Sequence, residues 1–230
     1  MTNKELFYFT AKCLMLNEDP SFRETIIESI ETDSIDWKIF ASLCSNHLVL
    51  PVIYLRFNSH QLLEHLPVEF VEFLKEIYEL NLNRNLQILE QLKAITNVLN
   101  QSNIYPTYLK GAAHLLDGLY SDVGERILGD IDFLVPEKNY LAAGKIMEKG
   151  GYKNIITKKI YYALESLKHY PRLAHPQFPA VIEIHRELTE SYLNWFNPKI
   201  VDSGKKEVDS LGGCYVLCDQ HKIILNFVHR

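Results

Sequence analysis

The sequence has no long apolar run that could serve as a membrane span or an export signal. A membrane-spanning helix needs about 18 or more consecutive apolar residues, and no such stretch occurs in this chain. Near the N-terminus Lys4, Glu5, Glu18 and Asp19 stand where a signal peptide would have its apolar core. We therefore expect a cytoplasmic protein.

Cysteine is scarce and unpatterned. The 230 residues contain four cysteines, Cys13, Cys44, Cys214 and Cys218. Cys214 and Cys218 have no second pair to complete a zinc site of four ligands. Reduced and buried thiols, as in a reducing compartment, are the expectation.

The chain also has no excess of positive charge and no glycine-rich Walker sequence. Its 24 Lys and Arg against 29 Asp and Glu give a net charge of -5, which argues against broad nonspecific binding of nucleic acid. The missing Walker sequence weakens an interpretation as a kinase. Hydrophobic residues make up 47% of the chain, which is ample for the core of one large or two small domains.

The first 103 residues have the apolar spacing of helices. Between Trp37 and Leu48 apolar residues recur every three or four positions, as in an amphipathic helix. A longer stripe runs from Phe70 to Leu99, with Pro67 suited to a first helical turn. This stripe predicts either one long helix or two helices that break near residues 81–85.

From residue 104 short strands alternate with helices. Strands are predicted at 105–109, around Asp130, at 153–156 and 160–164, and around Glu183; helices are predicted at 111–120 and 138–149, the latter ended by Gly150 and Gly151. Later segments are an aromatic helix or loop at 192–196, a turn at Gly212 and Gly213, and a helix from Gln220 to the last residue with Asp219 as its N-cap. We expect an α+β fold with a helical region at 1–103, a mixed-sheet core at 104–190 and a C-terminal extension at 191–230.

Two acids are predicted to project from one face of a strand. Successive side chains of a strand point to opposite faces, so Asp130 and Asp132 share a face while Ile131 and Phe133 share the other. Like charges about 7 Å apart raise each other's pKa unless a cation compensates them. Carboxylates without a thiol nearby favour a hard ion such as Mg²⁺, which usually completes its shell with water and phosphate.

A third acid lies in a second apolar strand, where Ile182 and Ile184 alternate with Glu183 and His185. Neighbouring strands lie about 4.8 Å apart, so Glu183 can join the two aspartates if the strands are adjacent. Two metal ions could then assist an in-line displacement at phosphorus.

Together these segments resemble the polymerase-beta-like nucleotidyltransferase superfamily, and within it an uncharacterised bacterial branch in which Lys-Gly replaces the usual Gly-Ser before a helix. The resemblance covers chiefly residues 105–190 and is carried by Lys110-Gly111, Arg126, Gly129-Asp130-Ile131-Asp132 and Val181-Ile182-Glu183-Ile184-His185. It implies a mixed sheet flanked by helices, two Mg²⁺ ions and a nucleoside triphosphate, with ATP expected. The reaction it implies is transfer of a nucleotidyl group to an acceptor hydroxyl, with release of pyrophosphate.

Under this resemblance Asp130, Asp132 and Glu183 would bind the metals and serve catalysis. Lys110 and Arg126 would contact the triphosphate, because an ammonium and a guanidinium are both good phosphate partners. Gly111 permits close approach of the backbone to a phosphate, and Gly129 is assigned to the same nucleotide site. Ala112 stands where most members of the superfamily have a phosphate-binding serine.

Two other functions remain open at this point. Ala112 would fit a noncatalytic relative that binds a nucleotide or a partner protein, and paired acids with magnesium also serve phosphohydrolases and kinases. His169, His175 and His185 match no compact zinc pattern, and His185 is expected beside the metals or on the acceptor side. Small molecules, sugars, peptides, proteins and RNA ends all remain possible acceptors.

Overall fold

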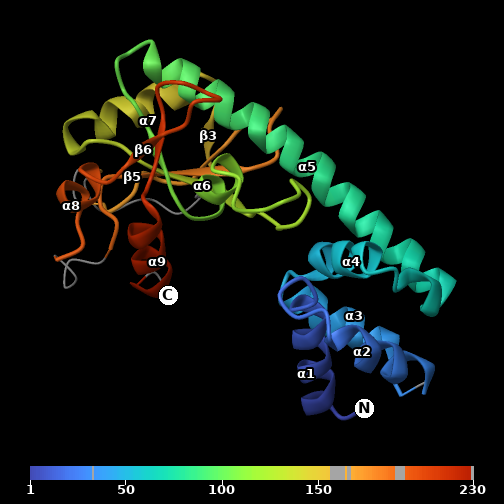
Figure 1. The fold of residues 1–230 in the computed structure, drawn as a ribbon. Coiled ribbons are helices and arrows are strands. Elements are labelled where there is room, and N and C mark those ends of the chain that lie inside the picture. Colours follow the sequence, from blue (N-terminus) through green and yellow to red (C-terminus); the bar gives the residue numbers. More distant parts are fainter. Residues whose placement is uncertain (33, 156–163, 165–166, 190–194, 229–230) are drawn as a thin grey trace. The chain divides into compact units, whose positions relative to one another are not determined.

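The computed structural model describes residues 1–32, 34–155, 164, 167–189 and 195–228 (Figure 1). Their fold is α+β, with helices and a mixed seven-stranded sheet, so the expected fold class is confirmed. The chain forms two compact units: Met1–Asn85 with Ser121–Ile127, and Leu86–Tyr120 with Leu128–Arg230. The division at residues 103 and 190 remains a proposal about function.

The first unit is a helical assembly around its own apolar core. Thr2 and Glu5 form a capping box at the start of α1, and the Asp36 carboxylate accepts hydrogen bonds from the Lys38 and Ile39 amides at the start of α3. Its helices are α1 (Asn3–Leu14), α2 (Phe22–Glu31), α3 (Trp37–Asn46), α4 (Leu50–Ser59), the 3-10 helix η1 (Leu63–His65) and the first part of α5 (Val68–Asn100). The fully buried residues of this unit include Leu16, Ile26, Phe40, Ile53, Phe57 and Leu74.

Helix α5 is continuous over 33 residues, which decides between the two alternatives for the apolar stripe. Asn81 and Asn85 do not break it, because their side chains bind the segment 121–127 of the same unit. Asn81 Nδ2 donates to the carbonyls of Gly124 at 2.7 Å and Arg126 at 3.1 Å. Asn85 Nδ2 donates to the carbonyls of Val123 at 2.7 Å and Arg126 at 2.8 Å. These asparagines therefore satisfy backbone carbonyls that helix and sheet leave free.

We expect Asn85→Asp to destabilise the first unit by about 2 kcal/mol, because a carboxylate oxygen would face two carbonyls that have lost their donor. Urea denaturation and amide exchange of residues 121–127 measure the effect. Asn83→Asp is the matched control, since Asn83 lies two residues away on the same helix and is exposed. Equal losses in the two variants would contradict the role of Asn85.

The sheet of the second unit has the strand order β3-β4-β5-β2-β1-β7-β6. Pairs β2·β5 and β1·β7 are parallel, and the remaining pairs are antiparallel. The strands are β1 (Thr107–Tyr108), β2 (Asp130–Leu134), β3 (Lys153–Asn154), β4 (Leu173–Ala174), β5 (Val181–His185), β6 (Lys206–Glu207) and β7 (Tyr215–Val216). The two longest strands, β2 and β5, are the two that were predicted to carry the acids.

Helices cover the apolar face of β2 and β5. Ile131, Phe133, Ile182 and Ile184 are fully buried in a core to which α5 and α7 also contribute. A smaller apolar cluster joins Leu134 to residues of α8 and α9. The helices of this unit are α6 (Lys110–Leu116), the 3-10 helix η2 (Glu137–Asn139), α7 (Tyr140–Lys149), α8 (Pro198–Asp202), α9 (Asp219–Val228) and the second part of α5.

Several predicted boundaries need correction. The helix predicted to reach residue 120 ends at Leu116, and Gly118 adopts a left-handed backbone at φ 71° soon after it. Asp219 is the first residue of α9 and not its N-cap. Strands β4, β6 and β7 and helix α8 were not predicted. The strand at 153–156 is observed at Lys153–Asn154. The predictions on residues 156, 160–163, 192–194 and 229–230 fall outside the described residues.

Gly144 in α7 lies against the ring of Tyr170. A Cβ at Gly144 would lie 2.2 Å from Tyr170 Cε2, which is too close for any real contact. We expect Gly144→Ala to destabilise the second unit by about 2 kcal/mol through overpacking, although helix propensity alone predicts a gain of about 1 kcal/mol. Denaturant unfolding of the variant decides the sign. A second change, Tyr170→Leu, should recover part of the loss, and a single variant more stable than the parent would refute this packing argument.

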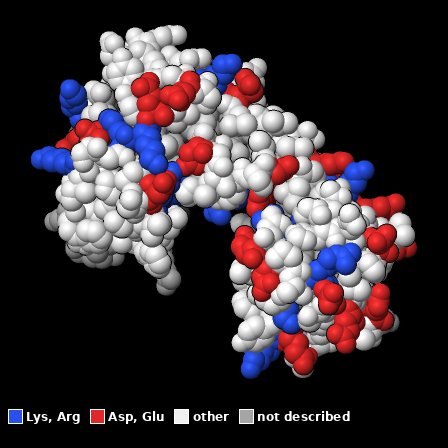
Figure 2. Space-filling view, in the orientation of Figure 1, with Lys and Arg blue, Asp and Glu red and all other residues white. Residues whose placement is uncertain are grey.

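On the face shown in Figure 2, Lys and Arg side chains are interspersed with Asp and Glu, and the described residues form no continuous basic stripe there. By length and composition, no single helix in the described part of the chain is suited to cross a membrane; α3 and α4 meet those criteria only when taken together, with a bend of 119° between them.

Candidate functional site

The parallel register of β2 and β5 places the predicted acids on one face of the sheet. Asp130 pairs with Val181, Asp132 with Glu183, and Leu134 with His185. Paired residues of adjacent strands point to the same face, so Asp132 and Glu183 lie side by side. The predicted convergence of acids from two separate segments is confirmed for this pair.

Asp132 is the most enclosed member of the group, with a side chain 2% exposed. Its Oδ1 lies 2.7 Å from Lys110 Nζ and 2.8 Å from His185 Nε2. Burial alone would raise the pKa of this carboxyl, but the hydrogen bond with His185 and the charge of Lys110 outweigh burial and lower the pKa to about 2. Asp132 is therefore an anion at neutral pH.

Glu183 and His185 complete a compact cluster with Asp132. His185 Nε2 lies 3.6 Å from Glu183 Oε2, and one ligand atom from each of the three residues lies within 4.8 Å of the others. The hydrogen bond with His185 lowers the pKa of Glu183 against the opposing effect of burial. For His185, burial lowers the pKa, but the bonds to both acids raise it overall.

Arg172, which precedes β4, was not among the predicted site residues. Its Nη2 lies 3.0 Å from Asp130 Oδ2 and its Nε lies 2.8 Å from Glu183 Oε1, so one guanidinium links both acids. The segment His169–Pro176 around it contains two prolines, which is typical of a loop, and such loops beside a sheet carry substrate contacts about as often as they form inert connections. Arg172 is the residue of that loop that reaches the acids.

Asp130 is the most exposed of the three acids and forms the solvent-open end of the site. Its side chain is 35% exposed, against 2% for Asp132, and Gly129 before it is exposed. Burial, followed by the charges of Asp132 and Glu183, raises the pKa of Asp130. The acids are therefore reached from solvent at the start of β2.

Lys110 reaches Asp132 from a strained backbone at the start of α6. Its φ of 49° lies in the left-handed region that residues with a Cβ rarely adopt. The preceding amide of Leu109 donates to the Asp132 carbonyl at 2.9 Å, which fixes the chain beside β2. Strain held in place in this way is typical of functional sites. Ala112, 1% exposed, belongs to the apolar core and acts as a packing residue.

Arg126 belongs to the first unit and Asp130 to the second. The Arg126 side chain is exposed, and its carbonyl is the group bound by Asn81 and Asn85. Its predicted contact with a triphosphate therefore stays a proposal, as do those of Gly111 and Gly129.

Comparison with known proteins identifies the family of the chain. A family described as uncharacterised nucleotidyltransferases matches residues 33–230, a range that includes every predicted site residue. The chain belongs to this family. The finer assignment to a bacterial Lys-Gly branch remains a prediction. No curated protein matches the chain.

A crystal structure of a candidate nucleotidyltransferase from Thermotoga maritima is similar to part of the chain. The identity is 16%, the match covers 61% of this chain and 83% of that one, and the TM-score is 0.44. The family assignment therefore depends on the match over residues 33–230.

The donor set of the cluster fits a divalent cation. Asp132 and Glu183 offer carboxylate oxygens and His185 an imidazole nitrogen, all within 4.8 Å of one another. The predicted ligand set was Asp130, Asp132 and Glu183. In the structure Asp130 is paired with Arg172, and His185 takes the place nearest the other two acids.

Proposed function

We propose that the chain transfers a nucleoside monophosphate from a nucleoside triphosphate, with ATP the expected one, to an acceptor hydroxyl and releases pyrophosphate. The observation that carries the proposal is the register of Asp132 against Glu183, with Lys110 and Arg172 in contact with the acids. Acids for metal binding and cations for phosphate thus meet at one place, as phosphoryl transfer requires.

Asp130, Asp132 and Glu183 would hold two Mg²⁺ ions, with His185 as a further ligand or as the group that orients Asp132. When bound, these ions would neutralise the charge that develops on phosphate oxygens during displacement. Lys110 and Arg172 form ion pairs with the three acids. With substrate present, these two cations, together with Arg126, would contact the triphosphate, and Gly111 and Gly129 would let the backbone approach it.

The protein's own contribution would be positioning and charge compensation. Glu183, which lies beside Asp132 in the paired strand, would accept the proton of the acceptor hydroxyl. The contact of His185 Nε2 with Asp132 Oδ1 at 2.8 Å would keep Asp132 oriented when Lys110 turns to the triphosphate.

The products formed from ATP test the proposal. Incubation of the purified protein with Mg²⁺, ATP and a panel of acceptors should release pyrophosphate. Release of ADP would indicate a kinase and release of phosphate alone a phosphohydrolase. A noncatalytic relative would give none of these products; Ala112 is weak support for that alternative, because it lies in the core.

Removal of divalent metal should abolish turnover and weaken nucleotide binding by about tenfold or more, because uncompensated acids repel a polyphosphate. Calorimetry of ATP binding with EDTA, and then with added Mg²⁺, measures both states. Nucleotide affinity that does not depend on the metal would contradict the assignment of the acids.

A further inference from the structure

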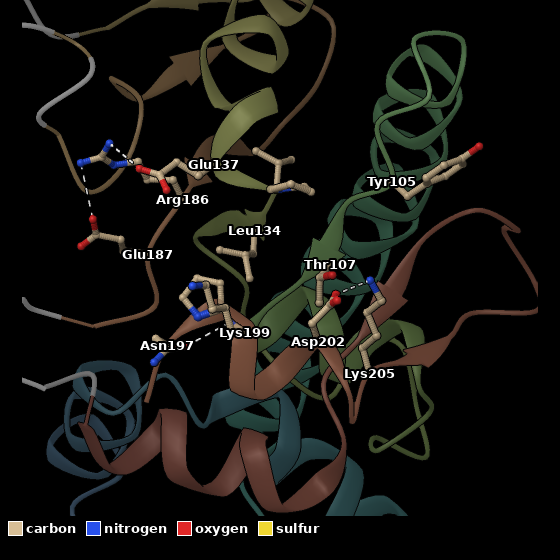
Figure 3. A pocket seen from close by; sticks show the side chains of 13 residues that line it. Tyr105, Thr107, Leu134, Glu137, Arg186, Glu187, Asn197, Lys199, Asp202 and Lys205 are labelled. Carbon is tan, nitrogen blue, oxygen red and sulfur yellow. Dashed lines mark hydrogen bonds and ion pairs between the residues drawn. The ribbon is translucent and has the colours of Figure 1, made fainter. Parts of the chain in front are cut away.

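A cavity of about 510 Å³ opens in the second unit at the carboxyl ends of β2 and β5 (Figure 3). Leu134 and Thr107 lie at its centre, between Glu137, Arg186 and Glu187 on one side and Asp202 and Lys205 of the α8 region on the other. More of its wall is apolar than polar. None of the residues assigned above to metal or nucleotide lines it.

The cavity lies on the far side of Asp132 from the open end of the site. Along β2 the order is Asp130, Asp132 and Leu134, and all three side chains share a face. Adjacent strand β1 is antiparallel and sets Thr107 against Leu134. Leu134 is therefore about 7 Å along the strand from Asp132.

This order suits an in-line displacement. In phosphoryl transfer the attacking oxygen and the leaving oxygen lie on opposite sides of the phosphorus. If pyrophosphate leaves at the solvent-open end near Asp130, the attacking hydroxyl comes from the opposite side. That side is the one with the cavity.

Size and charge limit what the cavity accepts. Small-molecule sites usually measure about 300–1,000 Å³, a range that includes this cavity. Its charged lining residues balance, three of each sign: Glu137, Glu187 and Asp202 against Arg186, Lys199 and Lys205. Ion pairs join Arg186 to Glu137 and Glu187, and Lys205 to Asp202. A lining with no net charge offers little attraction to a polyanion such as an RNA end.

We propose that this cavity binds the acceptor, a small hydroxyl-bearing molecule with an apolar body and little net charge. The proposal rests on the proposed function. In the reaction the acceptor oxygen forms a bond to the α-phosphorus, and the bond from that phosphorus to the bridging oxygen of pyrophosphate breaks. The hydroxyl proton passes to Glu183 and from there to solvent.

Two rim variants test the cavity without touching the acids. Tyr105→Ala removes an aromatic wall residue that is 45% exposed, so the fold should tolerate the change. Lys199→Glu changes the net charge of the lining from zero to minus two. The matched controls are Tyr8→Ala and Lys153→Glu, which make the same changes at exposed positions that do not line the cavity.

The probes are a panel of hydroxylated small molecules that are neutral, zwitterionic or anionic, a short RNA with a free 3′ hydroxyl, and Mg²⁺ with a non-hydrolysable ATP analogue. Ligand-observed NMR measures binding to the full chain. We expect one or more neutral or zwitterionic members to bind, with affinity reduced about tenfold in both rim variants and unchanged in both controls. Affinity for the ATP analogue should change less than about twofold in all four variants.

Three results would overturn the proposal: no panel member binds, panel members bind equally well to the rim variants, or RNA binds in their place. Displacement of a bound member by the ATP analogue would also overturn it, since the cavity would then belong to the nucleotide. Failure of the proposed function has a different signature. In that case the native chain shows no Mg²⁺-dependent binding of the analogue, whatever the panel does.

Discussion

Asp132→Asn should lower the rate of nucleotidyl transfer by about a thousandfold, which corresponds to about 4 kcal/mol in activation free energy. The change removes the negative charge of the most buried acid but keeps its shape and one acceptor oxygen for Lys110 or His185. Pyrophosphate release at saturating MgATP measures the effect. Circular dichroism should show an unchanged fold, with a stability loss of about 1–2 kcal/mol.

Asp117→Asn is the matched control for that prediction. Asp117 is also an acid in contact with a lysine of the second unit, Lys222, but neither residue is assigned to the site. Its turnover should stay within about twofold of the parent, because only a structural ion pair is lost. If Asp132→Asn kept full turnover, or if both variants lost it equally, the catalytic assignment of Asp132 would be wrong.

Arg172→Met should have opposite effects on metal and on nucleotide. Arg172 contacts Asp130 at 3.0 Å and Glu183 at 2.8 Å, so it competes with a cation for both carboxylates. Without it, Mn²⁺ alone should bind about tenfold more tightly. The KM for the triphosphate should rise about thirtyfold, because a guanidinium that pairs with phosphate oxygens is lost.

Electron paramagnetic resonance of bound Mn²⁺ and steady-state kinetics measure the two effects separately. Arg23→Met is the control, because Arg23 lies in the first unit and its Nε donates to the His60 carbonyl at 2.9 Å. A purely structural role for Arg172 predicts that metal and nucleotide affinity fall together. Only tighter metal binding together with weaker nucleotide binding supports a cation that moves from the acids to the phosphates.

Local patterns were sufficient to predict the two strands that carry the acids. Apolar and polar residues alternate over 130–133 in β2 and 182–185 in β5, which sets which side chains face the core, and Ile131, Phe133, Ile182 and Ile184 do so. The convergence of the acids was predicted on the condition that these strands are adjacent, and their parallel pairing, with Asp132 against Glu183, meets that condition.

Long-range register could not be predicted. Arg172 reaches the acids because β4 pairs antiparallel with β5, setting Leu173 against Ile182. Both residues of β4 are apolar or small, and a strand of two residues has no periodicity to detect. The close approach of His185 to Asp132 likewise depends on which strands are neighbours. The two-residue strands β6 and β7 were missed for the same reason.

The asparagines of α5 show how a polar residue in a helix can mislead. Asn81 and Asn85 suggested a break because asparagine has low helix propensity. Their side chains instead hold carbonyls of a segment about forty positions later in the sequence. No local sequence pattern indicates a hydrogen-bond partner that lies so many residues away.

The first unit is discontinuous in sequence, since it takes Ser121–Ile127 from between two parts of the second. No single cleavage of the polypeptide can therefore yield two complete halves. A fragment that starts after residue 103 would retain Ser121–Ile127 and lose Asn81 and Asn85, which bind it. Expression of the second unit by itself therefore needs a short replacement linker at 121–127, in addition to removal of residues 1–85.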